Sequence, residues 1–184
     1  MEEIMLYHAG FEIIKAPDVH YGRRNADFGQ GFYLSPDAEF SRRWARVRRG
    51  MTTFVNAYAL NPKGLDIRRL QRDEAWFDYI FDNRAFRPDR MAEADAILGP
   101  IANDTIYDVW GITTSGLIER PLALRLLQIG PAFIQVALKT PRAAAQLRWI
   151  DATPLFPEEI ESYRAVVRAE EADFQRRFAE ELER

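Results

Sequence analysis

The chain of 184 residues contains no cysteine and only two histidines, His8 and His20. The lack of cysteine excludes disulfide bonds, thiolate nucleophiles and the usual cysteine-based zinc sites. Two histidines argue against a centre built from several imidazole ligands, and they do not stand at metal-binding spacing. We therefore expect no bound metal.

Long apolar runs and a positive overall charge are also missing. No stretch has the length of a membrane span, and the segment MEEIMLYHAG lacks the basic region and apolar run of a signal peptide. These absences predict a cytoplasmic protein that does not contact the membrane. Because the net charge is −3, the protein as a whole does not attract nucleic acid electrostatically, although a local basic patch is compatible with this net charge.

Several common catalytic loops are absent as well. The chain has no Walker phosphate loop and no G-x-S-x-G nucleophile elbow, and GQGFYL lacks the third glycine of the dinucleotide fingerprint. What the chain does contain is a hydrophobic fraction of 47% and an aromatic fraction of 12%. This composition excludes the disordered class and is enough for a folded core.

Short apolar segments and helix-forming segments mix without the regular alternation of a doubly wound sheet, which predicts an α+β fold. We expect strands within residues 4–8, 31–34, 53–60, 95–104, 132–140 and 149–151. We expect helices within residues 36–50, 73–83, 115–128 and 142–147, and one that carries Ile106, Tyr107 and Trp110.

The helix expected over residues 36–50 has Ser35 as its cap and Pro36 at its first position, and it ends at Gly50. Helical spacing predicts a core-facing side that consists of Phe40, Trp44, Val47 and Met51. The other side carries Arg42, Arg43, Arg46 and Arg49. We interpret these arginines as a solvated face, with a contact to phosphate or to an acidic partner as the alternative.

The end of the sequence differs in composition from the rest. We predict one domain over residues 1–152 and a charged helical extension over residues 153–184. The extension has a thin apolar stripe, made of Ile160, Tyr163, Val167, Phe174, Phe178 and Leu182. Packing of this stripe on its own domain is the favoured interpretation, and a seam for a partner or a second copy is the alternative.

Three short stretches stand out as candidate site residues. In DFGQGFYLS, Phe32 and Tyr33 are adjacent, so in a strand they point to opposite faces, and only one of them needs to enter a core. His8 ends the apolar stretch LYHAG. Gln135 lies in the middle of an apolar strand, where an unpartnered amide would cost on the order of 2 kcal/mol or more. A structural role for each polar residue is the alternative to a binding role.

Taken together, these stretches resemble the ADP-ribosyltransferase fold. The segments LYHAG, NADFGQGFYLS, GPIANDTIYD and IQVALKT resemble still more closely a bacterial family of unknown function placed near that fold. The resemblance covers roughly residues 4 to 150. It implies split antiparallel or mixed sheets with flanking helices, and NAD as the substrate.

The resemblance also implies roles for individual residues. Tyr33 would stack on the cationic nicotinamide ring, with Phe32 in the core. His8 would bind a ribose hydroxyl, the backbone of Ala9 and Gly10 would grip the carboxamide, and Arg23 or Arg24 would meet the pyrophosphate. Gly29 and Gly31 would let the backbone approach the ligand. The same resemblance places the neighbouring Asp27, Phe28 and Ser35 at the cofactor site.

Cleavage of the nicotinamide glycosidic bond passes through an oxocarbenium-like state that nearby negative charge stabilises. Gln135 stands where the family's usual triad has a glutamate, and a glutamine supplies no charge. Asp104 is the best substitute carboxylate, with Asn103 beside it and Asp27 as the next candidate. Helix capping is the alternative role for Asn103 and Asp104.

The resemblance therefore implies an ADP-ribosyltransferase that moves ADP-ribose from NAD to a protein or nucleic-acid acceptor. By analogy with other bacterial transferases of this size, it implies a toxin that is held in check by an antitoxin protein. NAD hydrolysis, binding of NAD or ADP-ribose without turnover, and a protein-interaction role for the extension are the alternatives.

Overall fold

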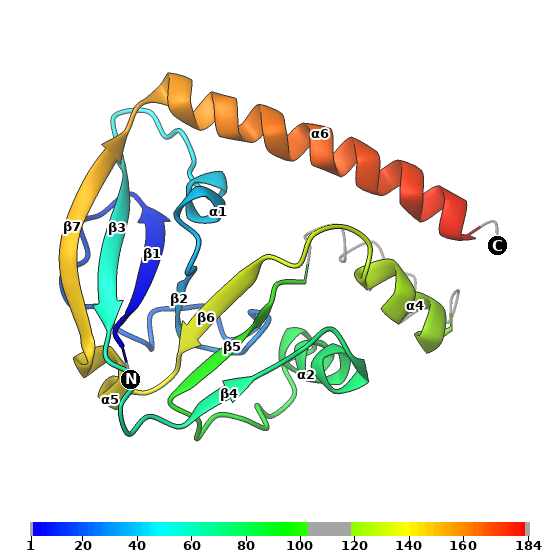
Figure 1. Cartoon of the computed structure of the whole chain (residues 1–184), viewed down its shortest axis with the longest axis horizontal. Helices are drawn as coiled ribbons and strands as arrows, with labels where there is room; N and C mark the ends of the chain where they lie inside the picture. The colour runs from blue at the N-terminus through cyan, green and yellow to red at the C-terminus, as the bar shows by residue number, and fades with distance from the viewer. Residues whose placement is uncertain (1, 103–118, 183–184) are drawn as a thin grey trace.

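The structure is a computed structural model that describes residues 2–102 and 119–182, and it contains two sheets (Figure 1). The first sheet is antiparallel, with strand order β1-β3-β7, where β1 is Ile4–Gly10, β3 is Thr53–Leu60 and β7 is Leu147–Leu155. The second sheet has the order β2-β6-β5-β4, made of Phe32–Leu34, Ile134–Leu138, Ala96–Pro100 and Ile67–Arg69. Its neighbours are antiparallel except β4 and β5, which are parallel.

Helices flank both sheets: α1 is Ala38–Arg43, α2 is Glu74–Arg84, α4 is Arg120–Leu127, α5 is Pro141–Ala145 and α6 is Pro157–Leu182. The predicted α+β class is confirmed. The last strand of the first sheet continues past residue 152 to Leu155, and the helical extension follows it. The helix expected around Ile106, Tyr107 and Trp110 lies outside the described residues.

The start of α1 corrects the expected cap. Asp37, not Ser35, is the N-cap, because its carboxylate accepts hydrogen bonds from the backbone amides of Glu39 and Phe40. The hydroxyl of Ser35 instead accepts a hydrogen bond from the backbone amide of Asp37 and donates one to the carbonyl of Ile134. Ser35 thus links the helix start to β6.

The length of α1 corrects the expected helix over residues 36–50. The helix ends at Arg43, and only Phe40 of the four predicted core residues is buried. Trp44, Val47 and Met51 have exposed fractions of 41%, 53% and 42%. Helical spacing misled the prediction because the chain leaves the helix before the second apolar turn.

Two large apolar clusters lie on opposite faces of the second sheet. One joins the sheet to α2 and α4 and includes Phe28, Trp76 and Leu126. The other fills the space between the sheets and includes Leu6, Phe32 and Tyr58. Because Phe32 is buried in this second cluster, its predicted inward orientation is confirmed.

Helix α6 leaves the first sheet and extends toward the region of α4 (Figure 1). Ile160 near its start is buried against Val55 and Leu155, and Phe178 packs on the cluster that contains Leu126. Packing of the apolar stripe on the chain's own domain is therefore confirmed for these residues. Among residues 2–102 and 119–182, no helix combines the length and the apolar character that crossing a membrane requires.

Asp95, just before β5, is expected to make folding sensitive to acid. Its buried carboxylate accepts hydrogen bonds from Arg142, from Thr140 and from the amide of Asp66, and the bonds from Arg142 hold its pKa well below the usual range. Because the pKa of Asp95 is lower in the folded state, its ionised form stabilises the fold fully above about pH 4, the pKa of an aspartate in the unfolded chain. This stabilisation is lost as the pH falls below that value and through the pKa of the folded state.

Urea unfolding at pH 7 and pH 3 measures this effect. We expect the Asp95→Asn variant to lose less of its free energy of unfolding between the two pH values than the native chain does. Asp151→Asn is the control, because that residue is exposed. An equal loss in Asp95→Asn and the native chain would contradict the assignment.

Candidate functional site

Within the described residues, a backbone bridge joins the two sheets between Tyr7 of β1 and Ser35, the residue after β2. The amide of Tyr7 donates to the carbonyl of Ser35 over 2.8 Å, and the amide of Ser35 donates to the carbonyl of Tyr7 over 2.9 Å. Beside this bridge lies a cleft of about 360 Å³. That volume lies within the range of small-molecule sites, about 300–1,000 Å³.

The cleft brings together residues that are distant in the sequence. Of the residues that the resemblance implied, those that line it are His8, Ala9, Arg23, Asp27, Tyr33, Ser35 and Gln135. Those that do not line it are Gly10, Arg24, Phe28, Gly29 and Gly31. Asn103 and Asp104, which were also predicted as site residues, lie outside the described residues.

Strand register explains why Tyr33 and Gln135 share the cleft. Tyr33 pairs with Ala137 across the β2–β6 ladder, and Gln135 lies two residues further along β6, so both side chains project from the same face. Phe32 and Leu34 project from the opposite face, into the core between the sheets. Both Tyr33 and Gln135 are half-buried.

His8 presents a hydrogen-bond acceptor to the cleft. Its Nδ1 lies 2.8 Å from the carbonyl oxygen of Tyr33, which can only accept, so Nδ1 carries the proton. Burial lowers the pKa of the imidazole, which favours the neutral form with a lone pair on Nε2. A Cβ atom on Gly10 would lie 3.2 Å from this Nε2, so the glycine at that position keeps it approachable.

The backbone of Ala9 faces the cleft as well. The amide and carbonyl of Tyr7 are used toward β2, away from β3. Because backbone groups alternate in direction along an antiparallel strand, those of Ala9 project from the same edge of β1. Because the bridge between Tyr7 and Ser35 is isolated, this edge of β1 opens at Ala9, which lines the cleft.

Tyr33 also closes the turn before β2. Its hydroxyl donates to the carbonyl of Gly29 and accepts from the amide of Phe28, and its ring lies 6.4 Å from the ring of Phe28 at an interplanar angle of 20°. Burial first, and the charge of Asp27 second, raise the pKa of the phenol well above its usual value. Tyr33 therefore stays neutral and cannot act as a base at physiological pH.

Asp27 is buried, and its carboxylate contacts groups within the protein. Its carboxylate pairs with Arg84 of α2, where the Nε–Oδ1 distance is 2.8 Å, and it accepts a hydrogen bond from the amide of Ala102. Its backbone carbonyl accepts a hydrogen bond from Asn83. Arg84 lines the cleft too, but no feature of the sequence distinguishes this arginine from the others.

The glycines of the turn make close approaches within the protein. Gly29 has a φ of +73°, and a Cβ atom there would collide with the side chains of Asp89 and Lys139. A Cβ atom on Gly31 would lie 2.7 Å from the carbonyl oxygen of Leu138. The side chain of Lys139 is buried, pairs with Asp89 and donates to the carbonyl of Phe28. These contacts stabilise the turn that precedes Tyr33.

A second cavity of about 610 Å³ adjoins the cleft beneath α6. Phe40 and Trp44 line both spaces. Phe133 stacks on Phe40 in its wall at a centroid distance of 4.4 Å, and the guanidinium of Arg43 lies 4.6 Å from the ring centre of Phe133. No local sequence pattern predicts this cavity, because it depends on the path of α6.

The fold and the cleft thus define an α+β protein in which two sheets meet at a small-molecule-sized site. A family model described as "Protein of unknown function (DUF3990)" matches residues 4–149, and the chain belongs to this family. Membership of a family of unknown function was expected from the sequence and is confirmed. No curated protein and no solved structure matches the chain. Within residues 2–102 and 119–182, no three His, Asp or Glu residues gather as a metal site.

Proposed function

We propose that this protein is an ADP-ribosyltransferase of the His-Tyr-Gln type, with NAD bound in the cleft between the sheets. The observation that carries the proposal is the convergence of His8, Tyr33 and Gln135 on one cleft from three separate strands. Each residue there presents the chemistry that its part of NAD requires.

The nicotinamide half of NAD matches the described walls of the cleft. The ring of half-buried Tyr33, which lines the cleft, would offer a platform for the cationic pyridinium ring. The backbone groups of Ala9 offer one donor and one acceptor, the complement of a carboxamide. Nε2 of His8 accepts a hydrogen bond from a ribose hydroxyl, and exposed Arg23 stands at the rim for the phosphates.

The charge of the cleft favours a second candidate function, which is binding of NAD or ADP-ribose without turnover. Among the described residues that line the cleft, Asp27 is the only carboxylate, and Arg84 neutralises it. Gln135 can orient a ribose hydroxyl but cannot stabilise an oxocarbenium ion by charge. A role as the toxin of a toxin–antitoxin pair stays a prediction.

Labelled NAD tests the proposal. The purified chain is incubated with NAD labelled in the adenylate half and with cell extract, beside Gln135→Ala and Gln135→Glu variants. We expect label on a macromolecule with the native chain, at least about tenfold less with Gln135→Ala, and more with Gln135→Glu, because a carboxylate stabilises the transition state by charge.

The other outcomes separate the candidates. Release of nicotinamide without labelled macromolecule would replace transfer by NAD hydrolysis. Binding of NAD by calorimetry, without any release of nicotinamide, would leave the binding function. A native chain that neither binds nor consumes NAD would overturn both proposals.

A further inference from the structure

A basic and aromatic surface segment runs from α1 toward β3 and ends at Met51. We call residues 42–51 the arginine segment, because they contain five arginines and no acidic residue in a chain whose net charge is −3. Most of the segment lies outside helix α1 and is exposed, including the large side chains of Trp44 and Val47. The sequence pattern alone had favoured a solvated helix face.

Three of the arginines pair with no carboxylate in the part of the chain that the structure describes. Arg42 and Arg43 pair with Glu39 and Glu170, respectively. By contrast, no carboxylate of residues 2–102 and 119–182 pairs with the exposed residues Arg46, Arg48 and Arg49. Such uncompensated charge on one segment of an acidic protein marks a surface for an anionic partner.

The arginine segment leads directly into the candidate site. Trp44 lines both the cleft and the larger cavity, and Arg46 lines the larger cavity. Exposed Arg23 lines the cleft, which extends from it to Trp44. A polyanion that lies along the segment would therefore reach the cleft that also holds Tyr33 and Gln135.

The combination of residues distinguishes among anionic partners. An acidic peptide would need only the arginines. Trp44 lies among these arginines and is 41% exposed, so its indole offers a flat surface for a nucleobase. Stacking on an indole requires a base that is not paired within a duplex. Arginines beside an exposed aromatic are the combination that binds unpaired nucleic-acid strands through phosphates and bases.

We propose that the arginine segment binds single-stranded nucleic acid and delivers a base of that strand to the cleft as the acceptor of ADP-ribose. The binding part stands on the surface alone, and the acceptor part rests on the proposed function. In the transfer, the bond between ribose C1′ and nicotinamide breaks, nicotinamide leaves with the bonding electron pair, and a nitrogen or oxygen of the base forms the new bond to C1′ and releases a proton.

Fluorescence anisotropy without NAD tests the binding part. The probes are labelled 12-nucleotide single strands of DNA and of RNA, the corresponding duplex, and polyglutamate as a competitor. We expect tighter binding of a single strand than of the duplex, and the DNA and RNA arms decide which strand is preferred. Affinity should fall with salt, and Arg48→Gln/Arg49→Gln should reduce the slope of log K against log salt by about 1.4, since each lost phosphate contact removes about 0.7.

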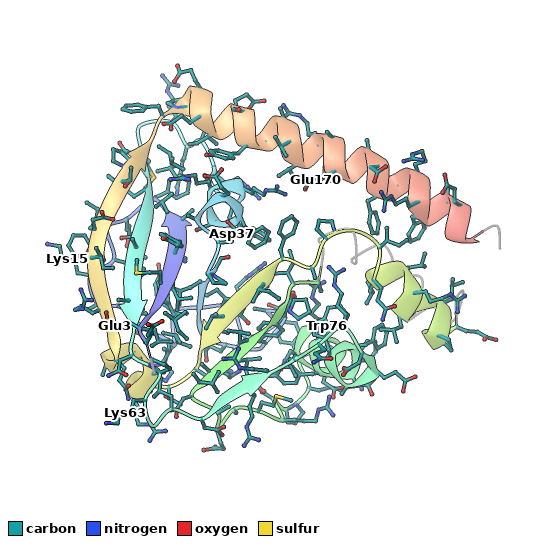
Figure 2. All side chains as sticks on the ribbon, in the orientation of Figure 1. Glu3, Lys15, Asp37, Lys63, Trp76 and Glu170 are labelled. Atoms are coloured by element: carbon teal, nitrogen blue, oxygen red, sulfur yellow. The ribbon has the colours of Figure 1, made fainter. Side chains whose placement is uncertain are left out.

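Two further variants separate charge from stacking. Lys63→Gln/Arg69→Gln removes the same charge from exposed positions in and before β4, and Lys63 lies far from α1 (Figure 2), so the slope should stay unchanged. Trp44→Ala should weaken binding of the single strand by about tenfold and leave duplex binding unchanged. Thermal unfolding of each variant verifies that it is folded.

Three results would overturn the binding part: no binding of either single strand at low salt, an equal effect of the two double variants, or displacement of the strand by polyglutamate at an equal charge concentration. If the strand binds as expected and labelled NAD gives nicotinamide but no labelled strand, the acceptor part fails while the proposed NAD chemistry stands. If nicotinamide is not released, the proposed function fails while the binding surface stands.

Discussion

Replacing Asp27 by asparagine is expected to lower the free energy of unfolding by about 3–5 kcal/mol, the usual cost of removing one partner from a buried ion pair. The side chains of Asp27 and Arg84 are only 9% and 11% exposed, so water cannot take over the lost interaction. The asparagine keeps an oxygen for the amide of Ala102 but leaves the guanidinium of Arg84 without its carboxylate. In a protein of this size, a midpoint lower by about 10 °C should result.

Glu3→Gln provides the matched control, because it breaks the Arg148–Glu3 pair, whose side chains are 62% and 51% exposed. Exposed pairs contribute about 0–1 kcal/mol, so this variant should unfold close to the native midpoint. Chemical denaturation of the three proteins at pH 7 measures the difference. Similar free energies for Asp27→Asn and Glu3→Gln would show that the pair does not hold the cleft together.

Replacing Tyr33 by alanine is expected to weaken NAD binding by at least about 30-fold, if the proposed function is correct. A desolvated contact between a cation and an aromatic face contributes about 2 kcal/mol or more, and the alanine removes the whole ring. Calorimetry with NAD measures the loss. The labelled transfer product should disappear with it.

Tyr33→Phe separates the ring from the hydroxyl. This variant keeps the platform but leaves the amide of Phe28 and the carbonyl of Gly29 without their partner, which should cost about 1–3 kcal/mol of stability. Its affinity for NAD should stay within about threefold of the native value. If the phenylalanine variant lost as much affinity as the alanine variant while folded, the hydroxyl, not the ring, would be the binding group.

Much of the fold was predictable because short-range patterns determine it. The helices predicted within residues 73–83 and 142–147 lie close to the observed α2 and α5, which Asp73 and Thr140 cap with their own side chains. The opposite orientations of Phe32 and Tyr33 followed from the period of a strand. Helix caps and strand alternation depend only on residues close together in the chain, so the sequence alone is enough to predict them.

The features that were missed depend on distant partners. The end of α1 at Arg43 breaks a good helical pattern, and the buried pair of Asp27 with Arg84 joins residues 57 positions apart. The cavity beneath α6 requires the path of a helix that starts more than 100 residues after Trp44. A single sequence does not encode such proximity in any local pattern.

The two sheets are also interleaved along the chain. The first takes its strands from residues 4–10, 53–60 and 147–155, and the second takes strands from the intervals between them. The strands of each sheet are therefore interrupted in the chain by at least one strand of the other sheet. β2 pairs with β6, and β1 shares a sheet with β7, and in both cases the two strands are more than 90 residues apart in the sequence. Because such pairings must close long loops first, folding should be slow and should wait for nearly the whole chain. A protease cut in any loop between the sheets should release no half that refolds alone.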